Sequence, residues 1–238
     1  IAASVVSKKV AAGAQVIVLD VKYGRGAFMK TLEEAERLAE GCREIGQRLG
    51  RGMVTVLSAM EQPLGYAVGH AVEIVEVVQT LKGNGPKDLE ALALCLGGLA
   101  LCKAGKAETP EAGEATLRTL LANGKAYAKF REMVRAQGGD PGLLPQPQRI
   151  GFLPAPTSGY VTDIDPMKVA LAVKELGGGR TSKTAPLDLG VGVVLHKKVG
   201  DFIEQGDTLA ELYADGQHYK HALELLRGAI RMDAAPPA

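Results

Sequence analysis

The chain has 238 residues, of which 46% are hydrophobic and 23% charged, a composition that indicates a globular protein of one or two domains and excludes a disordered tail or a fibre. Its 28 basic and 27 acidic residues leave a formal charge of +1, which argues against a nucleic-acid partner, because such binders carry a basic excess. The three cysteines, Cys42, Cys95 and Cys102, contain no CxxC pair, so neither a disulfide framework nor a zinc site is predicted. The sequence shows no signal peptide and no apolar run of about 18 residues, and we expect a cytoplasmic protein without a membrane partner.

The first elements in chain order predict a strand-helix-strand unit. The run 16–19 is short, continuous and rich in β-branched residues, as is typical of a strand buried in a parallel sheet. Thr31 is a good N-cap, and Glu34 three residues later completes a capping box for the next helix. The predicted elements are a helix over 1–12, a strand over 16–19, a helix over 31–49 and a strand over 53–57.

The middle of the chain has helical periodicity, and the last third changes character. Residues 138–147 are rich in Gly and Pro and indicate a linker. We expect a mixed α/β lobe with parallel βαβ units, followed by a smaller α+β C-terminal lobe. The further predicted elements are helices over 69–81 and 89–104, one or two helices over 110–137, a strand over 159–164, a helix over 167–176, strands over 191–196, 199–203 and 208–213, and a helix over 217–232.

Four long runs carry a resemblance to a known family. They are SVVSKKVAAGAQVIVLDVKYGRGAFMKT, SAMEQPLGYAVGHAVEIVEVVQTLKGNGPKDL, TSGYVTDIDPMKVALAVKELGGGR and LDLGVGVVLHKKVGDFIEQGDTLAELYADG. In this order they resemble the second half of the pyrimidine nucleoside phosphorylase and thymidine phosphorylase family. The resemblance implies that residues 1–12 end a helical lobe, 13–147 form the α/β lobe and 148–238 form the C-terminal lobe. It also implies phosphorolysis of a pyrimidine nucleoside to the free base and a pentose 1-phosphate, with inorganic phosphate as co-substrate and no organic cofactor.

Ser4 and Lys8 match the family positions that contact the pyrimidine. Their spacing of four residues places both side chains on one face of a helix. The resemblance implies that Lys8 stabilises the negative charge on the departing base and that Ser4 orients the ring by a hydrogen bond. Without the resemblance, Lys8 and Lys9 are a solvated helix face, and Lys9 keeps that interpretation.

Leu64, Ala67 and Glu76 match positions at which some bacterial members bind a cation. The resemblance implies two backbone carbonyls and one carboxylate around K+ or Ca2+, and oxygen ligands suit such a hard cation. The alternative is that Glu76 is an exposed helix carboxylate. Both interpretations stay open at this point.

The other polar residues have no assigned role. The loop 21–29 follows a buried strand, where open α/β sheets place ligands, but its contact with a substrate stays undecided. His218 and His221 are predicted to be a surface pair without a third metal ligand, and His70 and His196 are expected to be structural or exposed.

A second interpretation concerns the C-terminal lobe. HKKVGDFIEQGDTLAELYADG also looks like the half-barrel of a biotinyl or lipoyl carrier, which makes a non-catalytic binding or carrier module the alternative function. A carrier needs its modified lysine on a tight hairpin, whereas Lys220 lies in a helical pattern, so a packing role is favoured.

The family's K-H-S-T-G-G type phosphate loop and the arginine that accompanies Ser4 and Lys8 are not found in this sequence. We therefore expect the chain to be a fragment, a subunit of a split gene or a truncated form. The expected partner is the missing N-terminal half, and the complete protein is expected to be a homodimer. The sequence leaves the choice between thymidine and uridine open.

Overall fold

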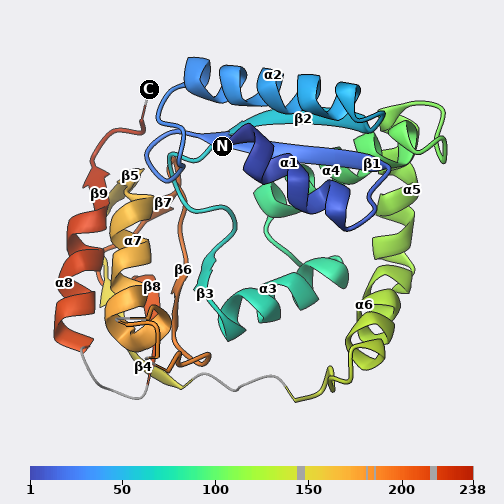
Figure 1. Ribbon diagram of the computed structural model, residues 1–238. Helices are drawn as coiled ribbons and strands as arrows, with labels where there is room; N and C mark the ends of the chain where they lie inside the picture. The colour runs from blue at the N-terminus through green and yellow to red at the C-terminus, as the bar shows by residue number, and fades with distance from the viewer. Residues whose placement is uncertain (144–147, 181, 185, 215–218, 238) are drawn as a thin grey trace. The chain divides into compact units, whose positions relative to one another are not determined.

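A computed structural model shows the arrangement of the chain (Figure 1). It describes residues 1–143, 148–180, 182–184, 186–214 and 219–237. The chain divides into two compact units. Unit 1 comprises Ile1–Met60 and Lys87–Tyr127, and unit 2 comprises Glu61–Pro86 and Ala128–Ala238.

Helices and strands are mixed along the chain and the strands form several sheets, which confirms the α/β class. Within the described part of the chain, every helix is too short or too polar to cross a bilayer. The helices are α1 (Ala2–Ala11), α2 (Leu32–Arg48), α3 (Ala71–Leu81), α4 (Lys87–Lys103), α5 (Pro110–Ala122), α6 (Lys125–Ala136), α7 (Pro166–Val173), the π-helical turn η1 (Lys174–Gly178) and α8 (Tyr219–Ala229). The strands are β1 (Val16–Tyr23), β2 (Gly52–Ala59), β3 (Ala67–Gly69), β4 (Arg149–Pro154), β5 (Gly159–Ile164), β6 (Gly192–Leu195), β7 (Phe202–Ile203), β8 (Thr208–Tyr213) and β9 (Ile230–Asp233).

The predicted strand-helix-strand unit is present at the start of unit 1. β1 and β2 pair in parallel, starting with Val16 opposite Gly52, and α2 connects them and packs against both. The predicted capping box is also present, since Thr31 Oγ1 accepts a hydrogen bond from the Glu34 amide at 3.3 Å and Glu34 Oε2 accepts one from the Thr31 amide at 3.4 Å. This cap fixes the start of α2, and so its position behind the loop that leaves β1.

α4 and α5 approach each other closely through two glycines. A Cβ at Gly98 would lie 2.5 Å from the carbonyl oxygen of Pro110, and a Cβ at Gly113 would lie 2.7 Å from the carbonyl oxygen of Gly98. Both distances are shorter than any real Cβ contact, so a larger residue at either position would push the two helices apart.

Unit 2 is built from two antiparallel sheets and the helices packed on them. In the described residues, one sheet has the strand order β3-β6-β8-β4 and the other the order β7-β5-β9. α7 and α8 pack against each other, and α8 also contacts β4, β8 and β9. The largest side chains that are fully buried in this core are Val161, Ile164, Val169, Val191, Val193, Leu195, Ile203, Leu212 and Leu226.

Residues 61–86 belong to unit 2 because β3 is a strand of its sheet. Ala67 lies opposite Val194, and Gly69 lies opposite Gly192. The sequence-based division into 1–12, 13–147 and 148–238 placed this segment with the α/β lobe instead. That division stays a prediction about the family's lobes, whereas the compact units follow the strand pairing.

Several elements differ from the prediction. The last helix ends at Ala229 rather than at 232, because residues 230–233 form β9 and pair with β5. β3 and β4 were not predicted, and the expected strand 199–203 is reduced to β7. The one or two helices predicted over 110–137 are two in the structure, α5 and α6. The expected linker 138–147 extends in part outside the described residues.

Candidate functional site

α1 presents Ser4 and Lys8 to solvent in unit 1. Both residues are exposed, and they lie four positions apart within the helix, as predicted. Val6 on the same helix is fully buried, and α1 packs against α2, where a Cβ at Gly41 would lie 3.4 Å from Ala2 Cβ. α1 is therefore anchored by its apolar side, while the side chains of Ser4 and Lys8 stay available to a ligand.

The loop after β1 is held firmly at the carboxyl end of the parallel pair. The Gly24 amide donates to the Met29 carbonyl at 3.0 Å, and the Gly26 amide donates to the Met60 carbonyl at 2.9 Å. Lys30 Nζ donates to the Ala27 carbonyl at 2.7 Å. Gly24 has φ +107, a conformation that disfavours any larger residue. These hydrogen bonds and the positive φ show that Gly24, Gly26 and Lys30 stabilise a tight turn after β1.

A polar cluster that sequence reasoning missed lies on β1 and β2. Lys22 Nζ lies 2.7 Å from Asp20 Oδ2 and donates to Ser58 Oγ at 3.0 Å, and Ser58 Oγ donates in turn to Asp20 Oδ1. Asp20 and Lys22 are two residues apart in β1, so their side chains lie on the same face of the sheet. Lys22 lies opposite Ser58 on β2. The two-residue spacing of Asp20 and Lys22 can be seen in the sequence, but their partner Ser58 is determined by the register between β1 and β2. The cluster fixes the polar side chains beside the loop.

Glu76 in unit 2 closes onto the loop that leads into β3. Its Oε1 accepts hydrogen bonds from the Tyr66 amide at 2.8 Å and from the Ala67 amide at 3.0 Å. A Cβ at Gly65, which has φ +68, would lie 2.3 Å from Glu76 Oε2. Glu76 is therefore not a solvated helix carboxylate, because it is partly buried and holds the backbone of this loop.

Lys198 supplies a positive charge to the same loop. Its Nζ donates to the carbonyl oxygens of Pro63 and Gly65, the latter at 2.8 Å, and lies 5.7 Å from the centre of the Tyr66 ring. The Val199 amide also donates to Gln62 Oε1 at 3.0 Å. The backbone carbonyls on either side of Leu64 thus face the Lys198 ammonium group.

Ala67 and Glu76 are joined by a hydrogen bond within unit 2, to which Leu64 also belongs, and Ser4 and Lys8 lie about one helical turn apart within unit 1. Among the described residues, no group of three or more His, Cys, Asp or Glu side chains could hold a metal ion.

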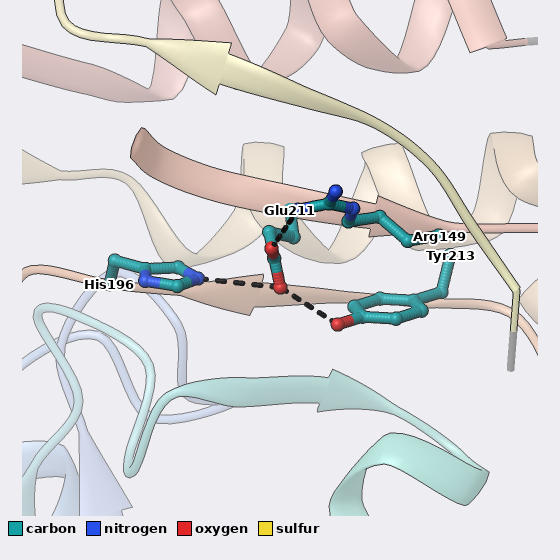
Figure 2. A network of polar contacts seen from close by, with 4 residues as sticks. All are labelled: Arg149, His196, Glu211 and Tyr213. Atoms are coloured by element: carbon teal, nitrogen blue, oxygen red, sulfur yellow. Dashed lines mark hydrogen bonds and ion pairs between the residues drawn. The ribbon is translucent and has the colours of Figure 1, made fainter. Parts of the chain in front are cut away.

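A second polar network crosses the β6-β8-β4 part of the larger sheet. Figure 2 shows Glu211 between the other three side chains: Arg149 Nη1 donates to Glu211 Oε1 at 2.8 Å, and the Tyr213 hydroxyl donates to Glu211 Oε2 at 2.7 Å. His196 Nε2 lies 3.4 Å from Glu211 Oε2. Glu211 and Tyr213 share a face of β8, and Arg149 on β4 lies opposite Tyr213, so the network joins these two strands to His196, the residue that follows β6.

The network changes the acidity of its members. Burial would raise the pKa of Glu211, but hydrogen bonds from Arg149, Tyr213 and His196 outweigh burial and lower it. Burial raises the pKa of Tyr213 to about 12, with a further contribution from its hydrogen bond to Glu211. The hydrogen bond to Glu211 also raises the pKa of Arg149. A carboxylate stabilised in its charged form by three donors fits a structural role better than proton transfer.

The remaining histidines and cysteines have structural or exposed positions. His70 Nε2 lies 2.9 Å from the Gly178 carbonyl oxygen, and His221 lies 3.9 Å from Glu224. His218 lies outside the described residues. Cys42 is fully buried, and burial raises the pKa of its thiol. The three cysteines are free.

Lys220 is the second residue of α8. The modified lysine of a carrier module lies on a hairpin between two strands, so the position of Lys220 does not favour the carrier interpretation.

The larger part of the chain matches a class of transferases. Residues 2–127 match the α/β domain of a glycosyl transferase family, which covers all of unit 1 apart from the first residue. Residues 160–233 match the C-terminal domain of pyrimidine nucleoside phosphorylases. The chain belongs to the pyrimidine nucleoside phosphorylase family.

Individual relatives agree with this assignment. The chain is 42% identical over 244 aligned residues to a pyrimidine-nucleoside phosphorylase of Bacillus subtilis (strain 168), an alignment that covers 100% of this chain and 56% of the relative. It is 45% identical over 236 residues to a pyrimidine-nucleoside phosphorylase of Staphylococcus aureus (strain USA300), covering 97% of this chain and 54% of the relative. The chain thus spans about half the length of the curated relatives it matches.

Proposed function

We propose that this chain takes part in the phosphorolysis of pyrimidine nucleosides, in which inorganic phosphate displaces the base and a pentose 1-phosphate forms. The observation that carries the proposal is the match to the family along both units, together with the exposed pair Ser4 and Lys8 on an anchored helix. The relatives are named pyrimidine-nucleoside phosphorylases, which supports a pyrimidine nucleoside as substrate.

Lys8 is proposed to stabilise the leaving base. When phosphate attacks the anomeric carbon, the electron pair of the N-glycosidic bond moves onto the pyrimidine, and negative charge develops on its carbonyl oxygens. A positioned ammonium group interacts more strongly with this charge than with the neutral substrate, which lowers the barrier. Ser4, one turn away on the same helix face, is proposed to orient the ring through a hydrogen bond.

Leu64, Ala67 and Glu76 are proposed to hold K+ or Ca2+. The carbonyls of the neighbouring Pro63 and Gly65 already accept hydrogen bonds from the Lys198 ammonium, which supports a preference of this loop for positive charge. A bound cation would stabilise the loop electrostatically and would leave the hydrogen bonds of Glu76 to the loop amides in place. The proposal is tested by thermal unfolding: KCl or CaCl2 raises the melting temperature of the unchanged chain more than that of Glu76→Gln at equal ionic strength.

The nucleoside preference, the oligomeric state and the cellular location are proposed from the resemblance to the family. Both thymidine and uridine are proposed substrates, and the complete enzyme is proposed to be a cytoplasmic homodimer. The missing-half partner is proposed to supply the segments of the relatives that the present chain does not cover.

The activity is tested in a protein that joins this chain to the uncovered part of the Bacillus subtilis relative. Uridine and thymidine are each incubated with and without phosphate, and the free base and pentose 1-phosphate are separated chromatographically. We expect release of base only when phosphate is present, with pentose 1-phosphate formed in equal amount. Base release of the same size without phosphate would identify a hydrolase and contradict the proposal.

A further inference from the structure

A pocket of about 430 Å³ lies in unit 1 at the amino ends of β1 and β2. The end of α2, the turn that follows it, the start of β2 and the end of α4 form its wall. Its charged lining residues are Arg43, Arg51 and Lys103, and no Asp or Glu is among its lining residues, all of which the structure describes. Arg43 is paired with Glu40, so Arg51 and Lys103 contribute the uncompensated positive charge of the cavity, which favours an anion.

Arg51, one of the residues that line the pocket, carries an unsatisfied donor. Its Nε is buried and has no hydrogen-bond partner among the described residues. A guanidinium group keeps its charge at any physiological pH, so deprotonation cannot relieve the missing hydrogen bond. A buried donor without an acceptor is costly, and an acceptor from a ligand removes that cost.

The positive charges are not needed as helix caps. At the end of α2 the Arg51 amide donates to the Gly46 carbonyl at 2.8 Å, and the Gly50 amide donates to the Gln47 carbonyl at 3.0 Å. At the end of α4 the Lys106 amide donates to the Leu101 carbonyl at 2.8 Å. Because the backbone itself satisfies these carbonyls, the side-chain donors have no such task.

The other two cations are held in place by their neighbours. Arg43 Nη1 donates to Thr55 Oγ1 at 2.5 Å, and Arg43 Nη2 pairs with Glu40. A guanidinium group has five N–H donors, so these two contacts do not use all of them. The stem of Lys103 lies over Gly52, where an added Cβ would be 3.3 Å from Lys103 Cε. Gly52 thus leaves room for Lys103 beside the pocket.

We propose that this pocket binds the phosphate group of a small anionic ligand. Arginine forks fit phosphate oxygens in pairs, and the lysine adds a point charge. The pocket lies at Gly52, the first residue of β2. The loop after β1 lies at the other end of the paired strands, about 23 Å away, because eight strand residues span seven steps of about 3.3 Å. The site is therefore separate from the carboxyl-end loop.

The test is calorimetric titration of the chain with inorganic phosphate and, in a second arm, with ribose 5-phosphate. Arg51→Gln removes the guanidinium whose Nε has no partner. Arg37→Gln is the matched control, because it removes an exposed positive charge from α2, the helix that ends just before Arg51. We expect Arg51→Gln to weaken binding by about tenfold or more and Arg37→Gln to leave it within about twofold. Unchanged circular dichroism shows that both variants fold.

The two ligands separate the sources of the phosphate group. Equal affinities support a site for free phosphate, and tighter binding of ribose 5-phosphate supports a site for a sugar phosphate. Absence of measurable binding of both ligands would overturn the proposal. Equal weakening by the two substitutions would also overturn it, because the effect would then be general charge screening.

Discussion

Tyr213→Phe removes the hydroxyl that donates to Glu211 and isolates its contribution to stability. Burial raises the pKa of Tyr213 to about 12, and its hydrogen bond to Glu211 adds to the rise. The folded chain therefore binds the phenolic proton more tightly than the unfolded chain, in which the pKa of a tyrosine is about 10. This difference corresponds to at most roughly 2.7 kcal/mol of folding free energy.

The sign of the pH dependence follows from that difference. Since the folded pKa is raised, the stabilisation is fully present below about pH 10 and is lost between about pH 10 and the folded pKa of about 12. Glu211 acts at the acid end: its folded pKa is lowered, so its stabilisation is present above about pH 4.3 and is lost as the pH falls through the folded pKa.

Urea unfolding of the unchanged chain and of Tyr213→Phe, followed by circular dichroism from about pH 8 to 12, measures this effect. We expect the unchanged chain to be more stable by about 1 kcal/mol at the lower pH values and to lose this advantage as the pH rises. Tyr160→Phe is the control, because Tyr160 makes an edge contact with Phe202 and lies outside the network. Stability curves of the unchanged chain and Tyr213→Phe that stay parallel through pH 10 to 12 would contradict a raised pKa of Tyr213 in the folded chain.

Three substitutions test the packing by urea unfolding. Gly98→Ala forces α4 away from α5 and should cost about 1–3 kcal/mol; an unchanged midpoint would mean that the helices do not pack as closely as described. Leu226→Ala leaves a cavity beneath α8 and should cost about 2–5 kcal/mol, and a loss below about 1 kcal/mol would contradict its complete burial. Thr31→Ala removes the N-cap of α2 and should cost about 1 kcal/mol, whereas Thr31→Ser should keep most of the cap; equal losses in both variants would contradict the capping role.

Local signals in the sequence predicted the early part of unit 1 well. The capping box of Thr31 and Glu34 and the β-branched run of β1 act over a few residues, so they can be read without the fold. β9 was missed because residues 230–233 directly continue an amphipathic helix and become a strand only by pairing with β5. β3 has three residues, too few for a periodic pattern.

The polar contacts show the same limit. The alternation of Glu211 and Tyr213 indicates a shared strand face, but their partner Arg149 comes from another strand through the register. Lys198 reaches the Pro63 carbonyl across 135 positions of sequence, and nothing in either segment predicts that contact. Ser4 and Lys8 were identified because their spacing is local and their motif resembles a family, whereas the Arg51 pocket depends on elements that meet only in the folded chain.

The proposed stabilisation of the leaving pyrimidine by Lys8 is tested by a matched pair of lysine substitutions. Steady-state phosphorolysis of uridine is measured for Lys8→Met and Lys9→Met in the protein completed with the uncovered part of the Bacillus subtilis relative. We expect Lys8→Met to lower kcat about 10²–10³-fold with a small change in KM, because the charge acts mainly in the transition state, and Lys9→Met to retain nearly full activity. Equal kcat values for the two variants, with both folded, would contradict the account.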